Sequence, residues 1–85
     1  MQVTLDLIGI IADYYPVKGD FSGGPVALDC AAGTTVRGLL EQVGVPNEEE
    51  YFIMLGGQRV ELEAAATHAL NDGDAVSLVA VIKGG

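Results

Sequence analysis

The residues of this sequence that are best placed to take part in a reaction are Gly84 and Gly85, which follow an apolar run and Lys83. Glycine has no Cβ and ranges widely in φ and ψ, so a terminal glycine pair presents a slender, accessible carboxylate. Such a carboxylate can enter a narrow site on another protein and react there, where any side chain would clash. The alternative is an ordinary frayed terminus, because chain ends are commonly poorly ordered. The preceding residues must decide between the two.

Three other groups of residues could carry chemistry, but none has a partner at a suitable spacing. Cys30 lies among apolar residues without a histidine or cation near it in sequence, which favours a small buried hydrophobe over a reactive thiol. His68 is the single histidine, and we expect a surface or packing residue. Glu48, Glu49 and Glu50 are adjacent, whereas hard-cation sites draw on spaced ligands. We therefore expect no catalytic residues, no bound metal or cofactor, and no autonomous enzyme.

The composition predicts one small domain spanning residues 1–85. Hydrophobic residues make up 49% of the chain and charged residues 19%, the balance of a globular protein. No apolar run is long enough to cross a bilayer, and no secretory signal is apparent. A single cysteine cannot form an internal disulfide, which agrees with a reducing compartment. We expect a soluble cytoplasmic protein without a membrane partner.

The charge is strongly acidic, with 12 acidic and 4 basic residues and a net charge of -8. Nucleic-acid binding depends on lysine and arginine neutralising phosphates, so a nucleic-acid partner is not expected. A protein partner with a basic docking face would be attracted instead. Solubility is an equally good explanation of the acidity.

The first half of the chain predicts two strands and one helix. Alternating apolar residues indicate strands near residues 3–7 and 25–31, separated by a long connection over residues 13–24. Threonine hydroxyls can cap a helix over residues 35–43, and Gly44 can end it in the left-handed conformation. The apolar stripe of this helix consists of Val36, Leu39, Leu40 and Val43.

The second half predicts three strands. Residues 51–55 form a short apolar run that is typical of a strand covered on both faces. The glycine pair 56–57 predicts a tight hairpin, with residues 58–62 as the returning strand. Residues 70–74, Leu-Asn-Asp-Gly-Asp, form a turn signal before a last strand over residues 75–82.

Both faces of the last predicted strand are apolar. One face carries Val76, Leu78, Ala80 and Ile82, and the other carries Ala75, Val79 and Val81. One set belongs in the core, and the other needs a cover, which could be a neighbouring element, a second copy of the chain or a partner protein. The partner is favoured because this strand leads directly into the terminal glycines. Together the elements predict an α+β roll, with a mixed sheet of four to five strands, one main helix and a flexible C-terminal Gly-Gly tail.

Several motifs in this order resemble one protein family. The run Gly33-Thr34-Thr35-Val36 with Leu39-Leu40, the turn Leu70-Asn71-Asp72-Gly73-Asp74, and the final Gly84-Gly85 span most of the chain. This set resembles the ubiquitin-like β-grasp sulfur carriers of the ThiS/MoaD family. The family includes the thiamine-biosynthesis carrier and the small subunit of molybdopterin synthase.

The resemblance implies a protein co-substrate that is not itself a catalyst. An E1-like enzyme would consume ATP to adenylate the carboxylate of Gly85, and a persulfide-bearing donor would convert it to a thiocarboxylate. An acceptor synthase, either the large subunit of molybdopterin synthase or thiazole synthase, would then take the sulfur. Residues 83–85 would form the reactive tail, in which Lys83 and Gly84 give access. The expected docking residues are Val76, Leu78, Val79, Val81 and Ile82.

The long connection over residues 13–24 is more like the molybdopterin-type carriers, although the proline that often precedes their terminal glycines is missing from residues 79–83. We therefore favour the molybdopterin type slightly over the thiamine type. Two alternatives remain open: a ubiquitin-like modifier joined to target lysines through Gly85, and an interaction domain that does not need Gly84-Gly85.

Overall fold

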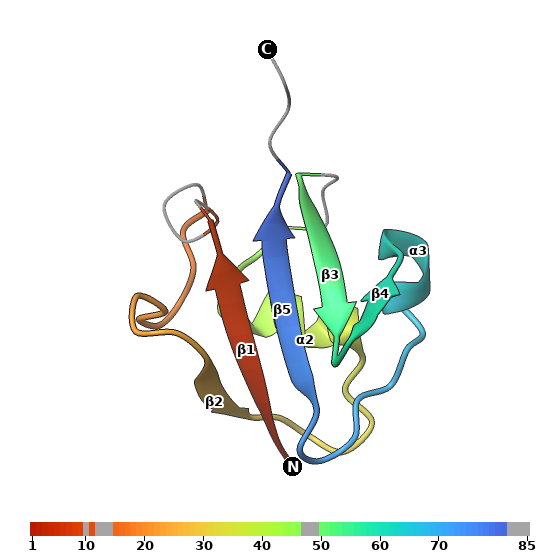
Figure 1. The fold of residues 1–85 in the computed structure, drawn as a ribbon. Coiled ribbons are helices and arrows are strands. Elements are labelled where there is room, and N and C mark those ends of the chain that lie inside the picture. The colour runs from red at the N-terminus through yellow and green to blue at the C-terminus, as the bar shows by residue number, and fades with distance from the viewer. Residues whose placement is uncertain (10, 12–14, 47–49, 82–85) are drawn as a thin grey trace.

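The computed structural model describes residues 1–9, 11, 15–46 and 50–81 (Figure 1). The two helices and five strands that have labels are, in chain order, β1 (Gln2–Ile8), β2 (Val26–Asp29), α2 (Val36–Val43), β3 (Tyr51–Leu55), β4 (Gln58–Val60), α3 (Leu62–Ala65) and β5 (Ala75–Ala80). This is the predicted order of elements, with the short α3 added. No helix in the described ranges has the length and apolar character needed to cross a membrane.

The five strands form one mixed sheet in the order β2-β1-β5-β3-β4. The last strand, β5, therefore lies in the middle, parallel to β1 and antiparallel to β3. In Figure 1, α2 lies behind this sheet, and the front face carries no labelled helix. The predicted α+β roll, with a mixed sheet of four to five strands and one main helix, is confirmed, and the sheet has five strands.

The helix α2 forms where the local signals predict it. The hydroxyl oxygen of Thr35 accepts a hydrogen bond from the N–H of Gly38 at 3.1 Å, which caps the first turn. Gly44 ends the helix with a φ of 91°, a conformation that glycine adopts without strain. The four residues of the predicted apolar stripe are all buried against the sheet.

The hairpin of β3 and β4 has the predicted turn but a shorter second strand. Leu55 pairs with Gln58 across the glycine pair 56–57. The strand β4 ends at Val60, before the predicted end at residue 62, because the chain turns there into α3. Phe52 is 37% exposed, so the prediction that this run is covered on both faces was wrong.

The turn before β5 joins the start of that strand to β1. The N–H of Asn71 donates to Oδ2 of Asp74 at 2.8 Å, and the N–H of Asp74 donates to the carbonyl oxygen of Asn71 at 3.0 Å. Gly73 adopts a φ of 88°, and its N–H donates to the carbonyl oxygen of Gln2. The side chain of Asp72 accepts from the N–H of Gln2 at 2.7 Å. The predicted turn is therefore confirmed, and it fixes the register of β1 and β5.

The core lies between the sheet and α2. Its most completely buried large side chains are Leu5, Leu39, Ile53, Leu78, Val3, Val36 and Val76. Two aromatic residues of the long connection, Tyr15 and Phe21, are buried as well. This connection is therefore part of the packed domain where it is described.

Candidate functional site

The central strand β5 places its two apolar sets in different environments. Val76 and Leu78 are 1% and 0% exposed, because they face the core beneath the sheet. The prediction that these two residues dock a partner was therefore wrong, because a partner could reach them only if the sheet opened. Val79 and Val81 are partly exposed, so their docking role stays a prediction. Ile82, which was also predicted to dock, lies outside the described residues.

A row of three apolar side chains crosses the outer face of the sheet at Val79. Val79 is in register with Ile8 of β1 on one side and with Phe52 of β3 on the other. Ile8 is 44% exposed and Phe52 is 37% exposed, and these two are the exposed large hydrophobic residues of the described chain. We call Ile8, Val79 and Phe52 the outer row. An exposed apolar patch of this kind is typical of a protein-binding surface.

Arg59 of β4 lies at the end of the outer row. Its guanidinium carbon is 4.2 Å from the centre of the Phe52 ring, a cation–π arrangement. Its Nε is 3.5 Å from Oε1 of Glu61, and both side chains are largely exposed. An exposed pair of this kind contributes little stability, about 0–1 kcal/mol. Sequence spacing does not single out Ile8, Phe52 or Arg59, because only the strand register brings them together.

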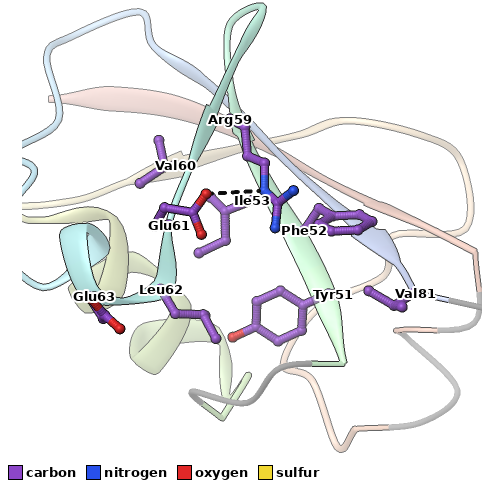
Figure 2. Close-up of a pocket in the computed structure, with 9 residues that line it drawn as sticks. All are labelled: Tyr51, Phe52, Ile53, Arg59, Val60, Glu61, Leu62, Glu63 and Val81. Atoms are coloured by element: carbon purple, nitrogen blue, oxygen red, sulfur yellow. Dashed lines mark ion pairs between the residues drawn. The ribbon is translucent and has the colours of Figure 1, made fainter. Parts of the chain in front are cut away.

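A pocket of about 340 Å³ lies beside the outer row, where the chain leaves β4 for α3 (Figure 2). Tyr51, Val60 and Leu62 supply apolar walls, and Figure 2 shows Tyr51 and Leu62 directed toward one another across it. The hydroxyl of Tyr51 donates to the carbonyl oxygen of Pro46 at 2.6 Å, which fixes the ring. Phe52 and Val81 also line the pocket, so it adjoins both the outer row and the end of β5.

The residue after β5 is held in place at the root of the predicted reactive tail. The N–H of Val81 donates to the carbonyl oxygen of Glu50 at 2.9 Å. Lys83, Gly84 and Gly85 lie outside the described residues, so their predicted roles stay predictions. The structure therefore defines the platform from which the sequence continues for four residues to Gly85.

The other candidate reactive residues that the structure describes lie apart from this platform. Cys30 is buried and forms no disulfide, as predicted for a small core residue. His68 is exposed, and its carbonyl oxygen accepts from the N–H of Val36. Glu48 and Glu49 lie outside the described residues. Within the described ranges, no group of three or more histidine, cysteine, aspartate or glutamate side chains is arranged to hold a metal ion.

The model of the ThiS family matches residues 11–85. The chain belongs to the ThiS family. A curated relative, "Sulfur carrier protein ThiS" of Escherichia coli (strain K12), is 41% identical over 59 residues, which cover 69% of this chain and 88% of the relative. The sequence relative is thus of the thiamine type, not of the molybdopterin type that the sequence analysis slightly favoured.

Solved structures show the same fold. The thiamine biosynthesis protein ThiS from Geobacter metallireducens has a TM-score of 0.66 at 27% identity, with all of both chains covered. SAMP1 from Haloferax volcanii has a TM-score of 0.69 at 17% identity, again over all of both chains. Urm1 from Trypanosoma brucei has a TM-score of 0.65 at 17% identity, covering 99% of this chain and 95% of Urm1. The predicted ubiquitin-like β-grasp fold is therefore confirmed, and the last two similarities concern the fold alone.

Proposed function

We propose that this protein is a sulfur carrier of the ThiS type, a co-substrate whose reactive group is the carboxylate of Gly85. The observation that carries the proposal is the family match over residues 11–85, supported by the 41% identity to a curated sulfur carrier. The outer row and the fixed position of Val81 support it physically. A partner that docks on Ile8, Val79 and Phe52 would lie beside the root of the tail.

The proposed chemistry proceeds in three steps on partner enzymes. A carboxylate oxygen of Gly85 attacks the α-phosphorus of ATP and displaces pyrophosphate, which gives an acyl-adenylate. The terminal sulfur of a persulfide donor then attacks the acyl carbon and expels AMP. A thiol cleaves the resulting S–S bond, which leaves a thiocarboxylate on Gly85 and a disulfide on the donor side. Two glycines favour this route because they can thread a narrow channel that would exclude side chains.

The proposal is tested by the intact mass of the chain. The chain is incubated with ATP, an E1-like activating enzyme from the same source and a persulfide donor. We expect a mass gain that corresponds to one oxygen replaced by sulfur. The variant that lacks Gly85 should keep the same fold by circular dichroism and gain no mass. The proposal fails if the full chain gains no mass with an activating enzyme that works on another carrier, or if the truncated chain gains it too.

We further propose that the acceptor is a thiazole synthase. The support is the thiamine type of the curated relative, which outweighs the length of the connection over residues 13–24. Thiocarboxylated chain should lose its sulfur to thiazole synthase and its substrates, and keep it when mixed with the large subunit of molybdopterin synthase and precursor. The reverse result would return the assignment to the molybdopterin type. The modifier alternative gains no support from SAMP1 or Urm1, since those similarities lie below the identity at which function can be compared.

A further inference from the structure

The pocket beside the outer row exists because β4 is shorter than β3. The pairing of the two strands runs from Leu55–Gln58 to Ile53–Val60 and goes no further. After Val60 the chain turns away into α3, so that residues 61–63 diverge from the beginning of β3. The space left between them is the pocket of about 340 Å³. Figure 2 shows Tyr51, Ile53, Glu61 and Leu62 around this gap, with Glu63 on α3 beyond Leu62.

The mouth of the pocket is acidic. Glu61 and Glu63 both line it, and both are exposed. Glu61 is paired with Arg59 at 3.5 Å, whereas Glu63 forms no ion pair within the described part of the chain. Arg59 is in turn stacked on Phe52. Among the described residues that line the pocket, two carboxylates therefore stand against one cation, in a protein whose net charge is -8.

We propose that this pocket is a socket for one lysine or arginine side chain of the activating enzyme that engages the tail. The methylene groups of such a side chain would pack on Tyr51 and Leu62, and its cation would lie between Glu61 and Glu63. Long basic side chains combine an apolar stem with a charged end, which matches apolar walls beneath an acidic mouth. Complementary charge at such a position contributes to partner selection and to the rate of encounter.

The position of the pocket identifies the occupant as the partner that handles the tail. Val81, which lines the pocket, is the last described residue before the predicted reactive tail, and Phe52 belongs to both the pocket and the outer row. A protein that covers the outer row and holds the tail must therefore also cover the pocket. An acidic side chain would meet two carboxylates there, and Arg59, the one basic residue among the described residues that line the pocket, is already engaged by Phe52 and Glu61.

The inference rests on the proposed function, and its test uses the full chain with ATP and the E1-like activating enzyme of the same source. The readout is the KM for the chain in ATP–pyrophosphate exchange. The double variant E61Q/E63Q keeps the shape of the pocket mouth and removes two charges. Because an exposed ion pair contributes modestly, we expect KM to rise about three- to tenfold at low salt with kcat unchanged. The rise should shrink at high salt, where exposed charges are screened.

The matched control is the double variant D29N/E41Q, which removes the same charge from β2 and α2, away from the pocket. Its KM should stay near that of the unmodified chain. Arg59→Met adds a test of sign: it keeps an apolar stem over Phe52 but removes the charge that pairs with Glu61, so KM should fall or stay the same. A rise in KM would mean that the partner presents an acid to Arg59, and it would overturn the socket. Equal KM values for the two double variants would also overturn the socket, while normal exchange by the unmodified chain would still support the adenylation step of the proposed function. No exchange by the unmodified chain would overturn the carrier, and the socket with it.

Discussion

Leu78 and Val79 are neighbours on β5 that face opposite sides of the sheet, so truncating each to alanine separates stability from docking. Leu78 is 0% exposed and lies in register between Leu7 and Ile53. Removing such a leucine costs about 2–5 kcal/mol, because buried apolar atoms are lost and a cavity remains. At about 0.05–0.15 kcal/mol per residue, a domain of 85 residues has a total stability of roughly 4–13 kcal/mol. Leu78→Ala therefore removes a large share of it.

Val79→Ala removes partly exposed atoms from the outer face, and we expect a cost of about 1 kcal/mol or less. In a domain of this size the melting temperature falls by roughly 4–8 °C for each kcal/mol lost. This ratio of melting temperature to free energy applies to both variants, so the melting temperature should fall at least about twice as far for Leu78→Ala as for Val79→Ala. Thermal unfolding followed by circular dichroism measures both.

The docking assay should rank the two variants in the opposite order. Val79→Ala removes contact area at the centre of the outer row, so its KM in ATP–pyrophosphate exchange should rise. Leu78→Ala, assayed well below its melting temperature, should keep the original KM because its side chain faces away from the partner. The reasoning is refuted if both variants lose the same stability, or if Leu78→Ala raises KM and Val79→Ala does not.

Three further predictions concern the scaffold. Gly9→Ala should lose about 1–3 kcal/mol in urea unfolding, because the residue has a φ of 89° and its new Cβ would lie 2.9 Å from Cβ of Ala80; unchanged stability would contradict this. Thr35→Ala should lose about 1 kcal/mol through loss of the helix cap, while Thr35→Ser should retain most of it. Hydrogen bonds from the hydroxyl and N–H of Ser22 lower the pKa of Asp20, so its small contribution to stability is present above the ordinary pKa and is lost as the pH falls through the lowered value. An NMR titration should show this low pKa, and Ser22→Ala should raise it.

The parts of the fold that the sequence predicted well are those with local causes. Thr35 and Gly44 flank the helix as cap residues, and caps act within one turn of their own position. The glycine pair 56–57 and the turn 70–74 likewise specify backbone conformations within a few residues. No distant contact is needed for these signals, so a single sequence suffices to read them.

The candidate site was harder to predict because its residues meet only through the sheet register. Ile8, Phe52 and Arg59 come from three strands, and nothing in the spacing of one strand indicates which residues lie beside it. In β5 the set that faces outward contains Ser77 between Ala75 and Val79, but the other residues of both sets are apolar, so one serine was the only sequence signal for the side that is buried. The position of α2 on one side of the sheet decides that question, and it placed Leu78 in the core.

The central position of β5 has a consequence for how a partner can use the tail. The strand is paired on both sides, its start is tied to β1 through the turn at residues 70–74, and its end is fixed by the hydrogen bond from Val81 to Glu50. A partner that pulls on the tail therefore pulls on a strand that can leave the sheet only if its hydrogen bonds to both β1 and β3 break. The four residues after Val81 can extend at most about 13–14 Å, at 3.3–3.6 Å per residue. Under the proposed function, an enzyme that docks on the outer row and adenylates Gly85 would therefore hold its ATP within that reach of Val81, so the surface around Val81 would contribute to the choice of enzyme.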